Sequence, residues 1–277
     1  MRNDRSFIEL RARERARNLL DDGSYRELLD PFDGIISPWL GPQGIVPQAD
    51  DGMVVAKGTI NGKPSVVVAI EGAFQGGSMG EVSGAKMAAA LELAAEDNRN
   101  GIPTQAVLSL ETGGVRLQEA NLGLAAIADI HAAIVDLRRY VPVIGIVTGT
   151  VGCFGGMSIA AALCSHLIVT REARLGLNGP QVIEQEAGIE EYDSRDRPFI
   201  WSMTGGEVRY HSGLVDALVP DGINAVKQAV QAAIDKGVPE KVRTDNYQWY
   251  LDRLTAFDTR QQADSDQIKQ LFGEVKS

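Results

Sequence analysis

A run of β-type residues, a glycine loop and a run of small residues follow one another between positions 141 and 179. This stretch constrains the fold more than any other part of the chain. Residues 141–147 are mostly apolar, with several β-branched members and no charge, which is typical of an interior strand. A glycine-rich loop follows, then small residues at helical spacing over 157–163 and a second apolar run at 167–170. The order predicts strand, loop, helix, strand.

The same order occurs twice earlier in the chain. Runs at 53–60 and 65–71 are joined by Asn61-Gly62, a strong hairpin signal, and a glycine loop leads into a predicted helix at 81–98 with many alanines. A third β-type run at 103–110 ends in a Gly-Gly loop, which we expect to open a long helix from about 115 to 140. Repeated units of this kind predict an α/β fold, with helices against a mostly parallel sheet.

The remaining segments give weaker signals. The N-terminal part predicts an amphipathic helix at 6–20, a further helical turn at 24–29 and a loop rich in Pro and Gly at 31–51. We expect one domain over residues 1–277, with a helical N-terminal extension to about residue 50 and a polar tail from about 258. Between them, the sequence predicts a loop or short helix at 180–188, a helical turn at 208–216, a short strand at 217–219, and helices at 224–235 and 245–257.

The composition excludes several classes of protein. The 277 residues carry a formal net charge of −10, and no basic block indicates a nucleic-acid partner. The densest basic run, Arg11 to Arg17 at alternate positions, is interpreted as a solvated or inter-subunit face. No apolar run spans a bilayer and the N-terminus is highly charged, so we expect no membrane association, no signal peptide and a cytoplasmic location. The two cysteines, Cys153 and Cys164, are interpreted as small buried hydrophobic residues.

One motif suggests a hydrolase. Residues 76–80 match the G-x-S-x-G nucleophile elbow, and a triad would need Ser78, His211 and an aspartate, Asp193 or Asp196. The predicted strand ends several residues too early for an elbow, however. The alternative is that Ser78 caps the following helix while the glycines allow close backbone packing. His131 and His166 are interpreted as structural, and no His, Cys, Asp or Glu spacing indicates a metal site.

Two glycine pairs stand at equivalent places in consecutive units, Gly113-Gly114 and Gly155-Gly156. Each follows a predicted strand and precedes a predicted helix, so its backbone N–H groups are expected to lack helical partners. Two such sets of donors converging on one pocket can stabilise an oxyanion without a charged side chain. The spacing therefore favours an enzyme that acts on acyl groups through a backbone oxyanion hole.

Four segments resemble the carboxyltransferase family of the crotonase superfamily. They are FQGGSMGE (74–81), ETGGVRLQEA (111–120), GTVGCFGGMSIAAALCSHLIV (149–169) and NGPQVIEQ (178–185). The resemblance implies the ClpP/crotonase fold, a crotonase-like ββα spiral with flanking helices. Within the family, the chain is most similar to β subunits of biotin-independent malonate decarboxylases. Thr112 and Val115 depart from the family's usual Ser and Ala, and Cys153 and Phe154 precede the second pair, so the shape of the acyl pocket is left open.

This resemblance implies decarboxylation of malonyl-S-acyl-carrier-protein to the acetyl thioester and CO2. The implied catalytic groups are the N–H groups of Gly113, Gly114, Gly155 and Gly156, which would stabilise an enolate. The implied substrate-binding residues are Gly76, Gly77, Val115, Arg116, Cys153 and Phe154. No metal and no covalently bound cofactor are implied, because the phosphopantetheine-type arm of the carrier delivers the substrate.

The implied partners are a homologous γ-type carboxyltransferase subunit, the acyl carrier protein and an acyl-carrier transferase subunit. Because such carriers are acidic, docking needs a basic patch, for which Arg116, Arg138, Arg139 and Arg171 are candidates. Two other functions remain open. The chain could be a β-type subunit of a biotin-dependent acyl-CoA carboxyltransferase, or a scaffold of the same fold that only supports a catalytic partner.

Overall fold

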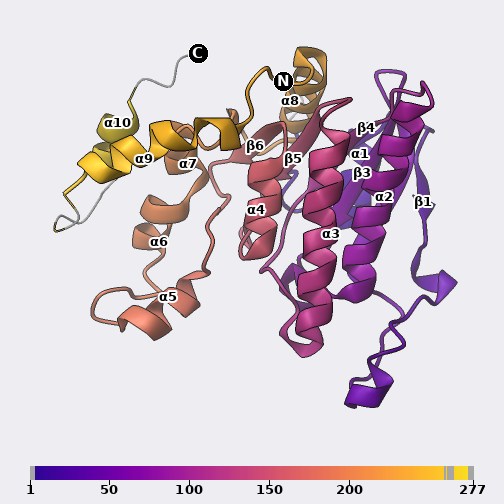
Figure 1. The fold of residues 1–277 in the computed structure, drawn as a ribbon, viewed down its shortest axis with the longest axis horizontal. Coiled ribbons are helices and arrows are strands. Elements are labelled where there is room, and N and C mark those ends of the chain that lie inside the picture. The colour runs from indigo at the N-terminus through magenta and orange to yellow at the C-terminus, as the bar shows by residue number, and fades with distance from the viewer. Residues whose placement is uncertain (1–3, 259, 261–264, 274–277) are drawn as a thin grey trace.

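The computed structural model describes residues 4–258, 260 and 265–273, and its strands form one seven-stranded sheet in sequential order (Figure 1). The first three strands pair antiparallel, and every later neighbour is parallel. This arrangement confirms the α/β prediction. The strands are β1 (Arg26–Leu28), β2 (Met53–Ile60), β3 (Lys63–Ile70), β4 (Gln105–Ser109), β5 (Val143–Val147), β6 (His166–Thr170) and β7 (Ala217–Val219).

Helices cover both faces of the sheet (Figure 1). Along β3, Val66 and Val68 belong to the core under α2 and α3, whereas Val67 and Ala69 belong to the core shared with α1 and α8. Burial on both faces explains why these strands are continuous apolar runs. The described helices are α1 (Ala12–Leu19), α2 (Glu81–Arg99), α3 (Asn121–Leu137), α4 (Gly156–Leu163), α5 (Pro180–Ala187), α6 (Arg197–Thr204), α7 (Gly206–His211), α8 (Ile223–Lys236), α9 (Tyr247–Ala256) and α10 (Ser265–Phe272).

Two local predictions are confirmed by backbone geometry. Asn61 (φ 50°) and Gly62 (φ 73°) form the turn between β2 and β3, and positive φ at both positions is what a tight hairpin of this hand requires. The small-residue face of α2 lets α3 approach closely, because a Cβ placed on Gly84 would lie 2.4 Å from the Cβ of Ala126. The glycine is therefore needed for this helix contact.

The N-terminal region differs from its prediction in two respects. The helix is shorter than predicted, covering Ala12–Leu19, and the predicted turn of helix at 24–29 is instead the edge strand β1. In addition, Arg15 is not on a solvated face: it is buried and forms an ion pair with Glu111. Positions two apart on a helix are about 200° apart around its axis, so the alternating arginines cannot all face one side.

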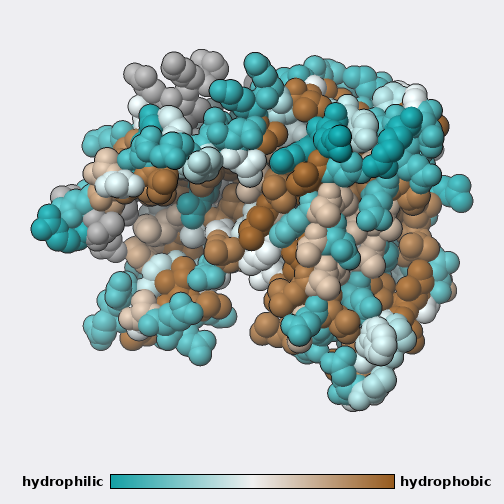
Figure 2. All heavy atoms as spheres, viewed as in Figure 1, coloured by the Kyte–Doolittle hydropathy of each residue, from teal (hydrophilic) through white to brown (hydrophobic). Residues whose placement is uncertain are grey.

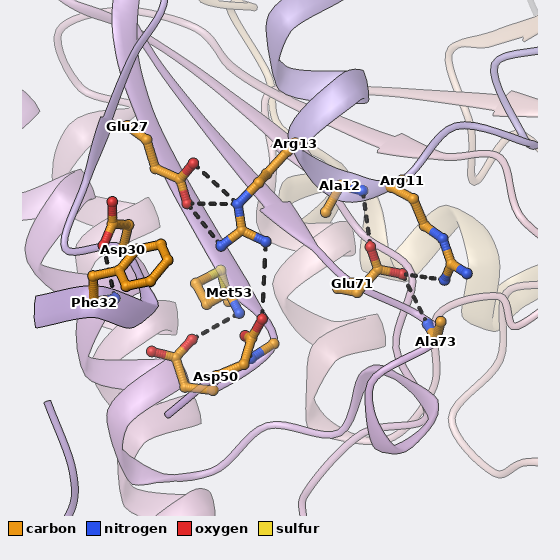
Figure 3. A network of polar contacts seen from close by, with 12 residues as sticks. Arg11, Ala12, Arg13, Glu27, Asp30, Phe32, Asp50, Met53, Glu71 and Ala73 are labelled. Carbon is orange, nitrogen blue, oxygen red and sulfur yellow. Dashed lines mark hydrogen bonds and ion pairs between the residues drawn. The ribbon is translucent and has the colours of Figure 1, made fainter. Parts of the chain in front are cut away.

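Polar contacts fix α1 to the sheet (Figure 3). The Glu71 carboxylate, just after β3, accepts from the Ala12 N–H at 3.1 Å and forms an ion pair with Arg11. The Arg13 guanidinium donates to both carboxylate oxygens of Glu27, at 3.0 and 3.1 Å. A carboxylate at the first turn of a helix is favourable because free N–H groups point outward there.

The first described residues also contact the last third of the chain. The Asp221 carboxylate accepts from the N–H groups of Phe7 (2.8 Å) and Ile8 (3.0 Å) and from the Ser6 hydroxyl (2.6 Å). The Asp4 carboxylate accepts from the Asn224 N–H at the start of α8. The N-terminal segment is thus held against the loop before α8.

The predicted polar tail contains a helix. Helix α10 covers Ser265–Phe272, and Phe272 is buried against Trp249 and Tyr250 of α9. The rest of the predicted tail, at 259, 261–264 and 274–277, lies outside the described residues, as do residues 1–3 of the predicted extension. Among the described helices, none combines the length and the apolar character that crossing a bilayer would require.

Candidate active site

The glycine-rich segments gather at one edge of the sheet. Residues 71–80, 111–120, 148–155 and 171–179 come after β3, β4, β5 and β6, and the carboxyl ends of parallel strands meet at the same edge. Isolated parallel bridges join these segments to one another, pairing Met79 with Val115, Thr112 with Cys153, and Cys153 with Leu175. Two glycine pairs distant in sequence are brought together in this way.

The first pair is built into these bridges. The Gly113 N–H donates to the Gly76 carbonyl at 2.9 Å, and the Gly114 N–H donates to the Thr112 hydroxyl at 3.0 Å. The prediction that this pair opens a helix at about 115 is wrong. A bridge and a 3₁₀ turn at Leu117–Glu119 intervene, and α3 begins at Asn121. Both N–H groups of this pair therefore already have acceptors.

The second pair opens a helix as predicted. Gly155 is the residue before α4 and Gly156 is its first residue. The Gly155 N–H donates to the Leu177 carbonyl at 2.7 Å, and the Gly155 carbonyl accepts from the Ser158 N–H (3.0 Å) and hydroxyl (2.7 Å). The Gly156 N–H donates to no acceptor in the described part of the chain. It is one of the free donors that a helix N-terminus leaves.

The two pairs are in contact. A Cβ placed on Gly155 would lie 3.3 Å from the Gly114 Cα and 4.0 Å from the Val115 nitrogen. The bridge between Met79 and Val115 uses the N–H groups of Met79 and Arg116, so the Val115 N–H donates to no acceptor among residues 4–258, 260 and 265–273. Two backbone donors without acceptors, those of Val115 and Gly156, thus flank the contact between the pairs.

The earlier glycine loop supports this arrangement. Gly76 (φ 65°) and Gly77 (φ 67°) have left-handed backbones, and a Cβ on Gly77 would lie 2.0 Å from the Glu111 carbonyl oxygen. Close packing by these glycines is confirmed. Ser78 does not cap the following helix, because α2 begins later, at Glu81, and the Gly80 N–H before it donates to Ser83 instead. The Ser78 hydroxyl accepts from Arg116 at 3.3 Å, and no described contact joins it to a histidine, so the hydrolase triad is not assembled.

Arg116, predicted to bind substrate, is buried in an internal network. Its guanidinium forms an ion pair with Glu119 at 2.9 Å and donates to the carbonyls of Asp51 (3.0 Å) and Ser78 (2.8 Å). The Arg116 guanidinium therefore connects three loops inside the protein and is not exposed for docking to a carrier protein. The other predicted docking residues also have partners: Arg138 donates to the Leu163 carbonyl, Arg139 pairs with Asp136, and Arg171 pairs with Glu207.

Cys153 and Phe154 directly precede the second pair. Both are buried, and burial raises the pKa of the Cys153 thiol and raises that of Cys164 to about 12. The interpretation of the cysteines as buried hydrophobic residues is confirmed. The Phe154 ring stacks under the guanidinium of Arg174, whose Cζ is 5.5 Å from the ring centroid. Phe154 therefore links the second pair to the segment after β6.

Both histidines have the structural roles predicted for them. Nε2 of His131 lies 2.8 Å from the Gly156 carbonyl oxygen, and Nε2 of His166 lies 2.8 Å from that of Gly237. The first contact ties α3 to the first turn of α4. In the described ranges, no group of three or more His, Cys, Asp and Glu side chains is placed to hold a metal ion.

Sequence reasoning missed a cavity beside this site. It measures about 760 Å³ and opens between the loop after β5 and the start of α6. The space-filling view shows that this face is hollowed between the lobe of α5 and α6 and the body that carries α3 and α4 (Figure 2). The lining comes from three segments far apart in sequence, so no motif marks it. The residues are Thr150, Arg174, Ser194, Arg195, Arg197, Pro198, Ile200 and Trp201.

Comparisons with known proteins agree with this geometry. The profile of the carboxyl transferase domain matches residues 9–258. The malonyl-S-ACP:biotin-protein carboxyltransferase MADC of Malonomonas rubra is 42% identical in an alignment 247 residues long, which covers 86% of this chain and 78% of that protein.

Solved structures extend the similarity. A chain of the Pseudomonas malonate decarboxylase hetero-tetramer, solved in complex with malonate, is 68% identical with a TM-score of 0.93, over 97% of this chain and 98% of that chain. A chain of the Pseudomonas MdcD-MdcE hetero-dimer is 61% identical with a TM-score of 0.77, over 91% and 97%. The predicted resemblance to malonate decarboxylase subunits and the predicted crotonase-like fold are confirmed. The chain belongs to the carboxyl transferase domain family.

Proposed function

We propose that this chain is the malonate decarboxylase subunit that converts malonyl-S-acyl-carrier-protein to the acetyl thioester and CO2. Two comparisons support the proposal: the 68% identity to a chain of Pseudomonas malonate decarboxylase, and the similarity to a carboxyltransferase that is named for malonyl-S-ACP. The observation that carries it is the pair of free N–H groups at Val115 and Gly156.

Loss of CO2 from a malonyl thioester leaves an electron pair that delocalises onto the thioester oxygen as an enolate. Donors already aimed at that oxygen lower the barrier, because no solvent has to reorganise as the charge develops. The proposed donors are the N–H groups of Val115 and Gly156. Of the four glycines implied by the resemblance, Gly156 stays a proposed donor. Gly113, Gly114 and Gly155 act by shaping the backbone, since their own N–H groups have acceptors.

The carbonyls of both donor peptides are also hydrogen-bonded. The Gly114 carbonyl, in the peptide of the Val115 N–H, accepts from Met79 at 2.8 Å. The Gly155 carbonyl, in the peptide of the Gly156 N–H, accepts twice from Ser158. A hydrogen bond to the carbonyl polarises a peptide and strengthens its N–H as a donor. Both donors are therefore fixed in place and activated by the chain itself.

The other implied residues shape the pocket around these donors. Gly76 and Gly77 belong to the loop that accepts the Gly113 N–H, and Arg116 joins that loop to Glu119. Cys153 and Phe154 are buried directly before Gly155. The proton that completes the acetyl group comes from water or from a residue of the partner. No covalently bound cofactor enters this scheme, because the thioester arrives on the phosphopantetheine-type arm of an acyl carrier protein.

A homologous γ-type carboxyltransferase subunit completes the site in this proposal. The similar Pseudomonas chains come from a hetero-tetramer and a hetero-dimer. Large apolar side chains are exposed around the site here: Leu117, Leu124, Ile159, Leu177, Val182 and Ile189. Exposed apolar side chains of this kind favour a protein partner as their cover. A transferase subunit that loads the carrier is the third proposed partner.

Replacing Gly156 by proline tests the proposed donor. Proline is tolerated at the first position of a helix, where the N–H has no helical acceptor, so Gly156→Pro removes the donor and keeps α4. Gly156→Ala is the matched control. Its Cβ meets the same Ile127 methyl, at 2.8 Å, but it keeps the N–H. We expect kcat to fall by about 100-fold or more in Gly156→Pro relative to Gly156→Ala, with unchanged assembly by size-exclusion chromatography. Equal kcat values in the two assembled variants would refute the role.

The name of the Malonomonas relative gives a second candidate reaction. That protein is a biotin-protein carboxyltransferase, so the CO2 group could instead pass to a biotin carrier. The two reactions differ in what they require. Release of CO2 from malonyl-S-ACP by the purified assembly, with avidin present to sequester biotin, supports the decarboxylase. Dependence of turnover on an added biotin protein would establish the carboxyltransferase.

A further inference from the structure

The cavity between the loop after β5 and helix α6 has a cationic lining in a chain of formal net charge −10. Three arginines reach it from two segments: Arg174 comes after β6, while Arg195 and Arg197 lie before and at the start of α6. No carboxylate side chain is among the described residues that line it. Positive groups focused in a hollow raise the local concentration of anions.

Arg174 has no carboxylate partner in the described part of the chain. It is held by neutral groups instead. Its Nε donates to the Thr150 carbonyl at 3.0 Å, and its Nη2 donates to the carbonyls of Thr150 (2.5 Å) and Val151 (3.3 Å), while its Nη1 has no described acceptor. Its Cζ lies 4.8 Å from the Trp201 ring centroid and 5.5 Å from that of Phe154. Partial burial is the main cause that lowers its pKa; Tyr192 acts in the opposite direction, and the charge of Arg197 acts in the same direction as burial. The guanidinium is thus fixed in orientation while its charge is not neutralised.

The two neighbouring arginines differ from each other. Arg195 forms an ion pair with Asp193 at 3.1 Å, so much of its charge is balanced. Arg197 is exposed and has no described ion-pair or hydrogen-bond partner. The guanidinium-bearing side chains of Arg174 and Arg197 therefore line one cavity, and no acidic side chain is among its described lining residues. Placing like charges close together is unfavourable unless an anion joins them.

We propose that this cavity binds an oxyacid group of the acyl-carrier substrate, through the guanidinium groups of Arg174 and Arg197. The inference rests on the proposed function for the identity of the substrate. Two groups of that substrate have the required chemistry: the free carboxylate of the malonyl unit and the phosphate of the carrier arm. Guanidinium groups donate charge-assisted hydrogen bonds to both of these oxyacid groups.

The cavity is joined to the proposed donors by the backbone. The Arg174 carbonyl accepts the Cys153 N–H at 2.9 Å, and three residues further on the Leu177 carbonyl accepts the Gly155 N–H. Phe154, between these two contacts, stacks on the Arg174 guanidinium. The Phe154 ring thus separates an anion bound to Arg174 from the loop that ends at Gly156. Trp201 and Pro198 add an apolar wall for the uncharged part of a ligand.

The test reverses one charge in the complex with its partner subunit. Arg197→Glu is the test variant, because this exposed residue can be changed without breaking a described contact. Arg26→Glu is the matched control, an exposed arginine with no ion pair to a described residue, on β1 at the opposite edge of the sheet. We expect KM to rise about 10-fold or more in Arg197→Glu, the value of one lost charge-assisted contact, with kcat within about twofold. The control keeps both parameters within about twofold.

Two substrates identify the group that is bound. Malonyl-pantetheine lacks the phosphate, whereas malonyl-4′-phosphopantetheine carries it. A rise in KM with both substrates assigns the cavity to the carboxylate. A rise only with the phosphorylated substrate assigns it to the phosphate. An unchanged KM for both, in a variant with wild-type thermal stability, overturns the proposal.

A binding measurement separates this inference from the proposed function. Titration calorimetry with malonate and with 4′-phosphopantetheine on wild type, Arg197→Glu and Arg174→Lys needs no turnover. We expect Arg197→Glu to weaken one of the two ligands about 10-fold, and Arg174→Lys to weaken the same ligand because lysine loses the planar group that the Thr150 carbonyl and the two rings orient. If the wild type binds one ligand at this cavity but does not decarboxylate, the proposed function fails and the site stands. Equal affinities in all three proteins refute the site.

Discussion

The two glycine pairs have the same sequence and lie against each other, yet they carry out different tasks. Gly113-Gly114 lies within a set of backbone bridges, and both of its N–H groups have acceptors. Gly155-Gly156 lies at the start of α4, where the Gly156 N–H has none in the described part of the chain. The first pair contributes a free donor only through the next residue, Val115.

The difference comes from the backbone conformation directly after each pair. After Gly156 the chain becomes helical at once, so its first N–H groups have no carbonyl one turn earlier. After Gly114 the chain forms a bridge with Met79. In this bridge the Arg116 N–H is bonded to the Met79 carbonyl, whereas the Val115 N–H before it is free of described acceptors. A helix start and a strand edge can therefore supply the same chemical group, one donor each. Four predictions test this comparison.

The largest effect is expected from breaking the ion pair between Arg15 and Glu111, because Glu111 contacts both glycine loops. The Glu111 carboxylate, next to the first pair, pairs with buried Arg15 and fills the space beside Gly149, where an added Cβ would collide with it. Arg15→Met leaves that carboxylate buried without a counter-ion. We expect the free energy of unfolding to fall by about 3–5 kcal/mol, measured by urea denaturation.

Arg15→Lys serves as the control for this change, since it keeps the positive charge. It should recover part of the stability but not all, because lysine cannot also reach the Ile8 carbonyl, to which Arg15 donates at 2.7 Å. A loss below about 1 kcal/mol in Arg15→Met would show that the loops do not depend on this ion pair.

The second prediction concerns the acceptor of the Gly114 N–H. Thr112→Val is nearly isosteric but removes the hydroxyl that accepts this N–H at 3.0 Å in a fully buried position. An unpaired buried N–H costs about 1–3 kcal/mol, so Tm should fall. Thr112→Ser keeps the acceptor and should lose less. If valine and serine have equal Tm values, the first pair is not held in the manner described.

Sequence reasoning found the sheet, the hairpin and both glycine pairs because each has a local signal. Asn61-Gly62 marks a turn, and successive residues of a strand such as β3 are all apolar because they point in turn into the two cores. It misplaced the start of α3 because residues 115–120 have helical composition. They are held instead by a bridge to Met79 and by the Arg116–Glu119 ion pair. The proposed donor role of Val115 and the arginine cavity depend on contacts between distant segments, which no single window of sequence contains.

The third prediction concerns Cys153, the bridge partner of Thr112, together with the other thiol, Cys164. Both thiols, Cys153 and Cys164, are buried with raised pKa values, so they stay protonated in the folded protein at pH values where the unfolded chain has lost those protons. The folded state then binds more protons, and its stability falls as pH rises above the ordinary thiol pKa of 9.0. We expect a declining free energy of unfolding above that pH, and no reaction of the native protein with iodoacetamide at pH 9. Rapid labelling of native Cys153 would contradict its burial.

The smallest effect is expected at Gly113. Its backbone φ is not in the left-handed region, and an added Cβ would meet only the Gly76 carbonyl oxygen, at 3.4 Å. Gly113→Ala should therefore keep kcat within about twofold and change stability by less than about 1 kcal/mol. A loss of activity as large as that expected for Gly156→Pro would erase the distinction between the two pairs.

The contact between the N-terminal segment and the Asp221 loop has a consequence for the order of assembly. Residues 4–8 are synthesised before the groups that hold them, because the Asp221 carboxylate and the start of α8 lie more than two hundred residues later in the chain. Such distant pairings form slowly because the intervening chain has to be closed into a loop. During synthesis α1 therefore has neither Glu111 nor Asp221 available at first. A chain released before about residue 225 would retain an unanchored N-terminal segment beside its glycine loops.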